Sequence, residues 1–287
     1  MASRKKLDLR KTLFLLPNMI TLSSIFCGFD SIRLSGSAAF GSAGDDDYYR
    51  ASLLLVYALF FDMLDGRVAR LTKTQSAFGL QIDSLADVVS FGVAPALLAY
   101  KWSLYQKETL GLVAAFTFAA AGAVRLARFN VLSMGESGTP TKPGKYIIGL
   151  PVPGAAGILV SLIVANHAIG GDFGGAKYVY GFMALTCFLA FLMVSTIRFR
   201  SFKDLRLNAR SVGLVLFAVL SSAVVSLQTK PAFVLVWLLS FYVIIGVVET
   251  AVTFPRRRRE GRERREVREL TEAAAAAAAE RPSLPPG

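Results

Sequence analysis

The sequence is poor in the side chains that support covalent catalysis or zinc binding. It contains one histidine and two cysteines among 287 residues. A nucleophilic dyad needs a base beside its serine or cysteine, and structural zinc sites need four cysteine or histidine ligands. His167 has no second histidine or neighbouring cysteine, and Cys27 and Cys187 lie inside apolar stretches without metal spacing. We interpret the cysteines as packing residues and His167 as a helix-end or interfacial residue.

Charged residues are also scarce, at 18% of the chain, whereas hydrophobic residues make up 54%. The mean hydropathy is +0.50, and the charges lie between long apolar runs. Because one membrane span needs about 20 apolar residues, we predict an all-α integral membrane protein with about eight transmembrane helices. The basic N-terminus is not followed by a short apolar core and a small-residue cleavage site, so we expect no cleaved signal peptide. The predicted helices cover residues 13–34, 50–66, 83–101, 108–126, 147–168, 178–197, 211–227 and 232–254.

The 32 lysines and arginines are divided unevenly between the two sides that these helices define. Cytoplasmic segments are enriched in lysine and arginine, so we expect a protein of the cytoplasmic (inner) membrane with both termini inside. The net charge of +12 then reflects orientation and attraction to anionic lipids. We expect no nucleic-acid partner, because no stacking aromatic residues interleave the basic clusters. With the N-terminus inside, only six basic residues fall outside: Arg33, Arg50, Lys101, Lys107, Lys177 and Lys230.

Four aspartates carry the clearest indication of chemistry. Asp62 and Asp65 are three residues apart, and Asp83 and Asp87 are four apart, so on helices the members of each pair share a face. Both pairs lie where apolar segments begin or end, on the predicted cytoplasmic side. Carboxylates that converge at a membrane edge repel one another and are costly to desolvate unless cations neutralise them. Hard divalent cations prefer such oxygen ligands, and two-metal sites stabilise phosphoryl transfer.

The segment from Asp62 to Asp87 reads D-x2-D-G-x2-A-R-x8-G-x3-D-x3-D. Every fixed position matches the signature of the CDP-alcohol phosphatidyltransferase family. Residues 16–21, 90–95, 125–130 and 149–153 further resemble the phosphatidylserine synthase branch. The resemblance extends over residues 12–210. It implies a six-helix catalytic domain within residues 1–210, which leaves an additional helix pair at 211–254 and a charged, Ala/Pro-rich cytoplasmic tail at 255–287.

This resemblance implies that a homodimeric enzyme transfers the phosphatidyl group from CDP-diacylglycerol to L-serine and releases CMP. It also implies two divalent cations, Mg²⁺ or Mn²⁺, held by the four aspartates, with Asp87 acting additionally as general base. A glycine next to a ligand allows close backbone approach to a nucleotide, which suits the positions that the family assigns to the donor. The implied donor-binding residues are Asn18, Thr21, Asp62, Asp65, Gly66, Ala69, Arg70 and Gly79.

The acceptor site is less defined. A guanidinium fork suits the carboxylate of serine, and Arg125 and Arg128 are three residues apart, so they share a helix face. Lys142 and Lys145 follow in a Gly/Pro-rich loop. These four residues, our expected acceptor-binding set, can equally be ordinary cytoplasmic anchors. The resemblance of residues 90–95 and 125–130, and not the charge itself, favours serine.

Several alternatives stay open at the level of the sequence. Glycerol 3-phosphate or an inositol phosphate can replace serine as the acceptor, and an ether lipid can replace the diacyl donor. A Mg²⁺-dependent membrane prenyltransferase also uses aspartate pairs, although these lie far apart in sequence. An ion carrier would place its carboxylates nearer the bilayer midplane. The charged tail forms either an interfacial helix on anionic headgroups or a solvated segment.

Overall fold

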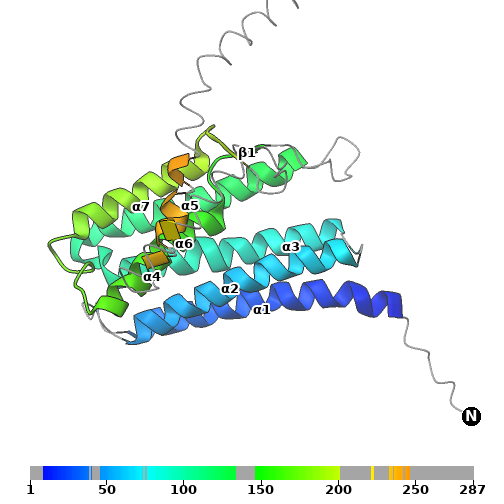
Figure 1. Ribbon diagram of the computed structural model, residues 1–287, viewed down its shortest axis with the longest axis horizontal. Coiled ribbons are helices and arrows are strands. Elements are labelled where there is room, and N and C mark those ends of the chain that lie inside the picture. Colours follow the sequence, from blue (N-terminus) through cyan, green and yellow to red (C-terminus); the bar gives the residue numbers. More distant parts are fainter. Residues whose placement is uncertain are drawn as a thin grey trace, which may run out of the picture.

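The protein was analysed as a computed structural model (Figure 1), which describes residues 9–38, 40, 46–72, 74, 76–133, 146–200, 221–222, 233–234, 236–241 and 243–245. Helices account for most of the described chain, as predicted. They are α1 (Leu9–Ser37), α2 (Asp46–Leu71), α3 (Ala77–Asp87), the π-helical η1 (Val88–Val93), α4 (Ala94–Trp102), the 3₁₀ helix η2 (Leu104–Lys107), α5 (Glu108–Ser133), α6 (Val152–Ile169) and α7 (Val179–Val194).

Three helical stretches in the described residues are long and apolar enough to cross a membrane. They are Ala77–Trp102, Leu104–Val131 and Val152–Ile169, and they support the expectation of a membrane protein. The total of eight spans stays a prediction, because most of the helix pair predicted at 211–254 lies outside the described residues, as does the tail at 255–287. The described parts of that pair are helical, and Leu239 lies directly against Gly157 of α6.

The helices pack closely through small residues. Figure 1 shows α1, α2 and α3 extended side by side, with α5, α6 and α7 beyond them. Gly28 of α1 faces Ser90 of η1, where a Cβ atom on the glycine would lie 2.8 Å from the serine Cα. Ser90 Oγ also donates a hydrogen bond to the carbonyl of Ser24, at 3.0 Å. This close approach, which is common between membrane helices with small residues at the contact, fixes α1 against the helix that continues from α3.

The first helix boundary that differs from prediction lies next to the acidic motif. We predicted that the second helix ends at residue 66, with the following basic residues in a loop, but α2 continues to Leu71. Val68, Ala69 and Arg70 do not break a helix, and a single glycine costs only about 1 kcal/mol in a helix interior. Gly66 and Arg70 therefore lie on the same helix as Asp62, not in a connecting loop.

The second boundary that differs lies before α6. We predicted a helix from residue 147, but Tyr146–Ile148 forms strand β1, which pairs antiparallel with β2 (Arg198–Arg200). Gly149 follows with a positive φ of 77°, and Pro151 disfavours helical backbone at the residue before it. For these reasons the helix begins only at Val152. Among the described residues, the pair of strands β1 and β2 is the one element that departs from the all-α prediction.

Candidate metal centre and its surroundings

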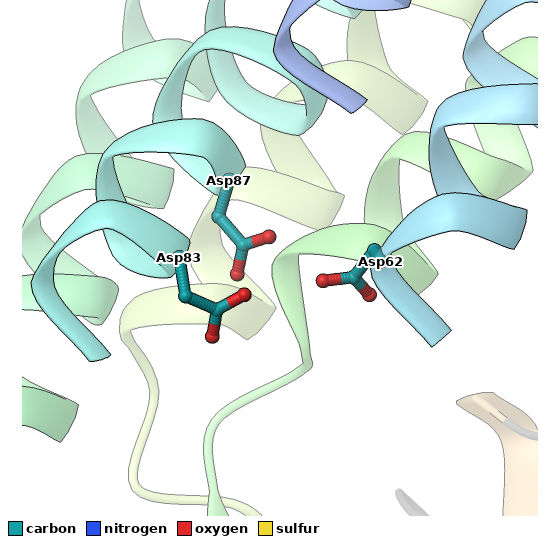
Figure 2. Close-up of side chains that lie close together, drawn as sticks. All are labelled: Asp62, Asp83 and Asp87. Atoms are coloured by element: carbon teal, nitrogen blue, oxygen red, sulfur yellow. The ribbon is translucent and has the colours of Figure 1, made fainter. Parts of the chain in front are cut away.

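Three of the four predicted aspartates come together in the structure. Asp62 projects from α2, whereas Asp83 and Asp87 project from one face of α3, as their four-residue spacing predicts. One carboxylate oxygen from each residue lies within 4.8 Å of the other two. Figure 2 shows the three carboxyl groups pointing toward a common space between the two helices. All three side chains are partly buried, so their charges cannot be fully screened by water.

The donor set of this cluster fits a hard divalent cation. Mg²⁺ binds oxygen ligands at about 2.1 Å, so two ligands on opposite sides of one ion lie about 4.2 Å apart. The three oxygen atoms lie within 4.8 Å of one another, which is close to this separation. Without such an ion the partly buried carboxylates repel one another. The cluster can therefore hold a divalent cation, with Asp62 on one side and the two α3 aspartates on the other.

Asp65 lies outside this three-residue cluster and has a partner on α1. The Thr21 hydroxyl donates to Asp65 Oδ2 at 2.6 Å, and the two residues are only 5% and 4% exposed. Arg70, further along α2, is close enough to attract the same carboxylate. Thr21, which we expected beside a nucleotide, thus orients an aspartate. The predicted role of Asp65 as a metal ligand remains a proposal.

The remaining donor-binding candidates come from the same three helices, α1, α2 and α3. A Cβ atom on Gly66 would lie 3.5 Å from Arg70 Nη1, so the guanidinium group covers the surface that the glycine leaves open. A Cβ atom on Gly79 would lie 3.7 Å from Asn18 Oδ1, which places the α1 amide beside the first turn of α3. Ala69 is partly buried on α2. The structure therefore brings Asn18 and Gly79 together, and separately Gly66 and Arg70.

Ser76 was missed by the sequence analysis. It caps α3, and its Oγ accepts a hydrogen bond from the Gly79 amide at 2.9 Å. A serine directly before an apolar helical stretch is a known start signal, so the sequence contained the information needed. The cap moves the start of this helix from the predicted residue 83 to Ala77, and it places Gly79 inside the first turn.

The two arginines of the predicted acceptor site differ in burial. Arg125 of α5 is 9% exposed and is close enough to Asp87 to attract its carboxylate. Arg128 is exposed. A shared helix face therefore did not give them a shared environment, because only Arg125 is covered by the surrounding helices. Lys142 and Lys145 lie outside the described residues.

A second connection between α5 and α3 involves Asn130, which had no assigned role. Its Nδ2 atom lies 2.9 Å from Ser84 Oγ, and its Oδ1 atom lies 3.1 Å from the same hydroxyl. Ser84 directly follows Asp83 in the sequence. No local pattern could reveal this pairing, because the two residues are 46 positions apart.

Comparisons with known proteins agree with this geometry. The family model described as CDP-alcohol phosphatidyltransferase matches residues 14–192, which include all four aspartates. A protein of Helicobacter pylori (strain 26695) named CDP-diacylglycerol–serine O-phosphatidyltransferase is 38% identical over 237 residues, covering 83% of this chain and 91% of its own. Proteins with the same name from Bacillus subtilis (strain 168) and Methanocaldococcus jannaschii are each 35% identical. They cover 66% and 69% of this chain and 91% and 83% of their own lengths.

Proposed function

This chain belongs to the CDP-alcohol phosphatidyltransferase family, and we propose that it transfers the phosphatidyl group of CDP-diacylglycerol to the hydroxyl group of L-serine. The products are phosphatidylserine and CMP. One observation carries this proposal. The alignment covers 91% of the length of a Helicobacter pylori relative that is named for the serine reaction, at 38% identity. The cluster of Asp62, Asp83 and Asp87 lies within the matched residues and supplies the expected anionic site.

We propose that the acidic cluster holds two divalent cations, Mg²⁺ or Mn²⁺. Asp62, Asp83 and Asp87 provide oxygen atoms that are close enough for shared coordination, and Asp65 extends the ligand set along α2. Bound cations neutralise the diphosphate of the donor and stabilise the charge that develops on the departing CMP. The hydrogen bond from Thr21 to Asp65 keeps that carboxylate oriented, since a ligand needs a fixed direction as well as a charge.

Residues on α1, α2 and α3 bind the cytidine diphosphate part of the donor in this proposal. The Arg70 guanidinium beside Gly66 binds a phosphate oxygen, and the absence of a Gly66 side chain leaves room for the guanidinium group at this place on the helix. Asn18 and Gly79 border the nucleotide, with the Gly79 backbone fixed by Ser76. Thr21 and Ala69 complete the contact surface. Small residues are needed here because a larger side chain would occupy the nucleotide space.

Asp87 is the proposed general base. It accepts the proton of the serine hydroxyl, while the serine oxygen forms a bond to the phosphorus of the phosphatidyl group. The bond between this phosphorus and the phosphate oxygen of CMP breaks, and CMP leaves. Arg125 lies close enough to Asp87 to attract its carboxylate, and bound divalent cations would hold that carboxylate in the ionised form that a base requires. Asp87 orients the hydroxyl through the same contact, so its roles as base and as ligand are compatible.

In this proposal basic groups bind the acceptor, and Arg125 makes the main contact. Its burial beside Asp87 places a guanidinium group where a serine carboxylate can receive two parallel hydrogen bonds while the serine hydroxyl faces the base. The proposed set is completed by Arg128, Lys142 and Lys145, as basic groups that can attract the serine carboxylate.

We propose that the acidic cluster faces the cytoplasm from the inner membrane, with both termini inside, and that the enzyme is a homodimer. The distribution of lysine and arginine supports the orientation. Labelling with a membrane-impermeant thiol reagent tests it, after Cys27 and Cys187 are replaced by alanine. Asp46→Cys should react in intact cells, whereas Leu71→Cys should react only after lysis. The reverse pattern would overturn the orientation.

The central experiment measures CMP release from CDP-diacylglycerol by the purified full-length chain. Parallel reactions contain L-serine, glycerol 3-phosphate or an inositol phosphate, and an ether-linked donor is compared with the diacyl donor. We expect release with serine only, loss of release with a chelator, and recovery with Mg²⁺ or Mn²⁺. Release with a phosphorylated acceptor instead of serine would assign a different acceptor. Full activity in a metal-free preparation would remove the metal site from the mechanism.

A further inference from the structure

Ser84 and Asn130 connect α3 to α5 immediately beside the acidic cluster. The Asn130 amide donates to Ser84 Oγ at 2.9 Å, and the Ser84 hydroxyl can donate in turn to the Leu80 carbonyl at 3.0 Å. The single Ser84 hydroxyl proton can go either to this carbonyl or to Asn130 Oδ1, which lies 3.1 Å away. Ser84 is 9% exposed, and hydrogen bonds shielded from water hold their geometry more strongly.

Ser84 and Asp83 face different helices although they are neighbours in sequence. Successive residues of an α-helix point about 100° apart, so the contact of Ser84 with α5 directs Asp83 away from α5. The Asp83 carboxylate lies instead with that of Asp62 on α2. Rotation of α3 about its axis would break the Ser84–Asn130 contact and move both α3 carboxylates relative to Asp62.

An attraction between charged groups follows the same register. α5 runs antiparallel to the helix that begins with α3, so that Asn130 lies opposite Ser84 and Arg125 lies near Asp87. Two polar interactions at different heights define the rotation of a helix better than one.

We propose that Asn130 and Ser84 form a positioning pair, which holds α3 in the rotation that brings Asp83 and Asp87 to Asp62 and thereby sets the affinity of the site for divalent cations. Neither residue touches the cations or the substrates in this proposal. It rests on the proposed function, because it assigns the pair a purpose in the metal site of that reaction. A merely structural hydrogen bond would contribute to stability without affecting cation binding.

Direct binding of Mn²⁺ tests the pair independently of catalysis. The purified full-length chain in detergent is titrated with Mn²⁺, and the free ion is measured by electron paramagnetic resonance. Asn130→Ala and Ser84→Ala should each weaken binding about tenfold, since indirect support of metal ligands contributes effects of about 10- to 100-fold. The double variant should be no weaker than either single variant, because the two residues share one contact. Ser84→Thr, which keeps the hydroxyl, should bind within about threefold of wild type.

Tyr48→Phe is the matched control. The Tyr48 hydroxyl donates to the Lys101 carbonyl at 2.9 Å, which is also a buried contact between two helices, but it lies far from the aspartates along α2. This variant should lose thermal stability to a similar degree and bind Mn²⁺ normally. If Asn130→Ala does not fold, Asn130→Leu keeps the branching of the side chain and removes the same hydrogen bonds.

The outcomes separate two kinds of failure. If wild-type protein binds no Mn²⁺, the metal part of the proposed function is wrong. If wild type binds and the Asn130 and Ser84 variants bind equally well, the positioning pair is wrong while the proposed function stands. Additive losses in the double variant, or an equal loss in Tyr48→Phe, would likewise overturn the pair.

Discussion

At one end of the helical bundle Asp62, Asp83 and Asp87 converge from two helices, whereas at the other end two lysines lie against aromatic rings. There Lys101 lies over the ring of Phe40 at 3.6 Å, and Lys107 lies over the ring of Tyr180 at 4.0 Å. Cation–π contacts of this kind need no further ligand. These two lysines, which define the lysine–aromatic end, are stabilised by neighbouring rings without an added ion.

This difference between the two ends indicates which end is the functional one. Stability alone favours the arrangement at the lysine–aromatic end, in which opposite or complementary groups meet. Like charges gathered in a partly buried space oppose folding, and such arrangements persist mainly at functional sites. We call the end that holds Asp62, Asp83 and Asp87 the acidic end. Substitutions there should change activity, whereas substitutions at the lysine–aromatic end should change stability.

The largest effect is expected from the aspartates. Asp62→Asn and Asp83→Asn should each reduce CMP release about a thousandfold or more, because metal ions contribute several kcal/mol to transition-state stabilisation and each 1.36 kcal/mol is tenfold in rate. Asp46→Asn is the control at the lysine–aromatic end, where Asp46 is exposed beside His167; it should stay within about twofold of wild type. Comparable losses of CMP release in all three variants would contradict the functional difference between the two ends.

A smaller effect is expected from the arginines, and the structure separates them. Arg125→Ala should raise the KM for serine about ten- to a hundredfold, since a hydrogen bond to a charged group is worth about 1.5–3 kcal/mol. Arg128→Ala should raise it less than about threefold, because the side chain is exposed. The KM for CDP-diacylglycerol should change little in either variant. Loss of donor affinity with an unchanged serine KM would move Arg125 from the acceptor to the diphosphate.

Thr21→Val tests the support of Asp65. The change preserves side-chain shape and removes the hydroxyl that donates to Asp65 Oδ2, so kcat/KM should fall about tenfold, the lower end expected for a hydrogen bond to a charged group. Thr21→Ser keeps the hydroxyl and should recover most of this loss. Steady-state kinetics with each substrate varied measures both variants. Equal activity of the valine and serine variants would show that this hydrogen bond does not contribute to the site.

The smallest effect on activity is expected at the lysine–aromatic end. Tyr48→Phe removes the buried hydrogen bond to the Lys101 carbonyl and should destabilise the protein by about 1 kcal/mol, equivalent to about 2–4 °C in the melting temperature of a chain of this size. Serine transfer by the folded variant should stay within about twofold of wild type. A large loss of turnover at unchanged stability would link this end to catalysis and weaken the comparison.

Much of the acidic site was predictable because it depends on local spacing. Asp83 and Asp87 are one helical turn apart, so any helix places them on one face, and the structure confirms this arrangement. The extent of α2 was not predictable in the same way. Gly66 suggested a helix end, yet the residues after it continue the helix, because packing along α1 outweighs the weak local preference of one glycine.

Partners distant in sequence were beyond the reach of pattern analysis. Arg125 and Arg128 looked equivalent by spacing, but only Arg125 is buried beside Asp87. Asp65 looked equivalent to Asp62, but Thr21 of another helix holds its carboxylate. Each distinction depends on which helix covers which face, and that information is absent from the order of residues along one helix.

The sequence by itself determined the chemistry that this protein has available: apolar helices, carboxylate pairs at helical spacing, and few histidines or cysteines. These properties follow from composition and from the 3.6-residue period of the helix, both of which act locally. Only the tertiary structure decided which carboxylates meet and which side chains orient them, including the contact between Ser84 and Asn130. The physical reason is that helix packing joins residues through close approach of small side chains and hydrogen bonds, and these interactions depend on distance in space.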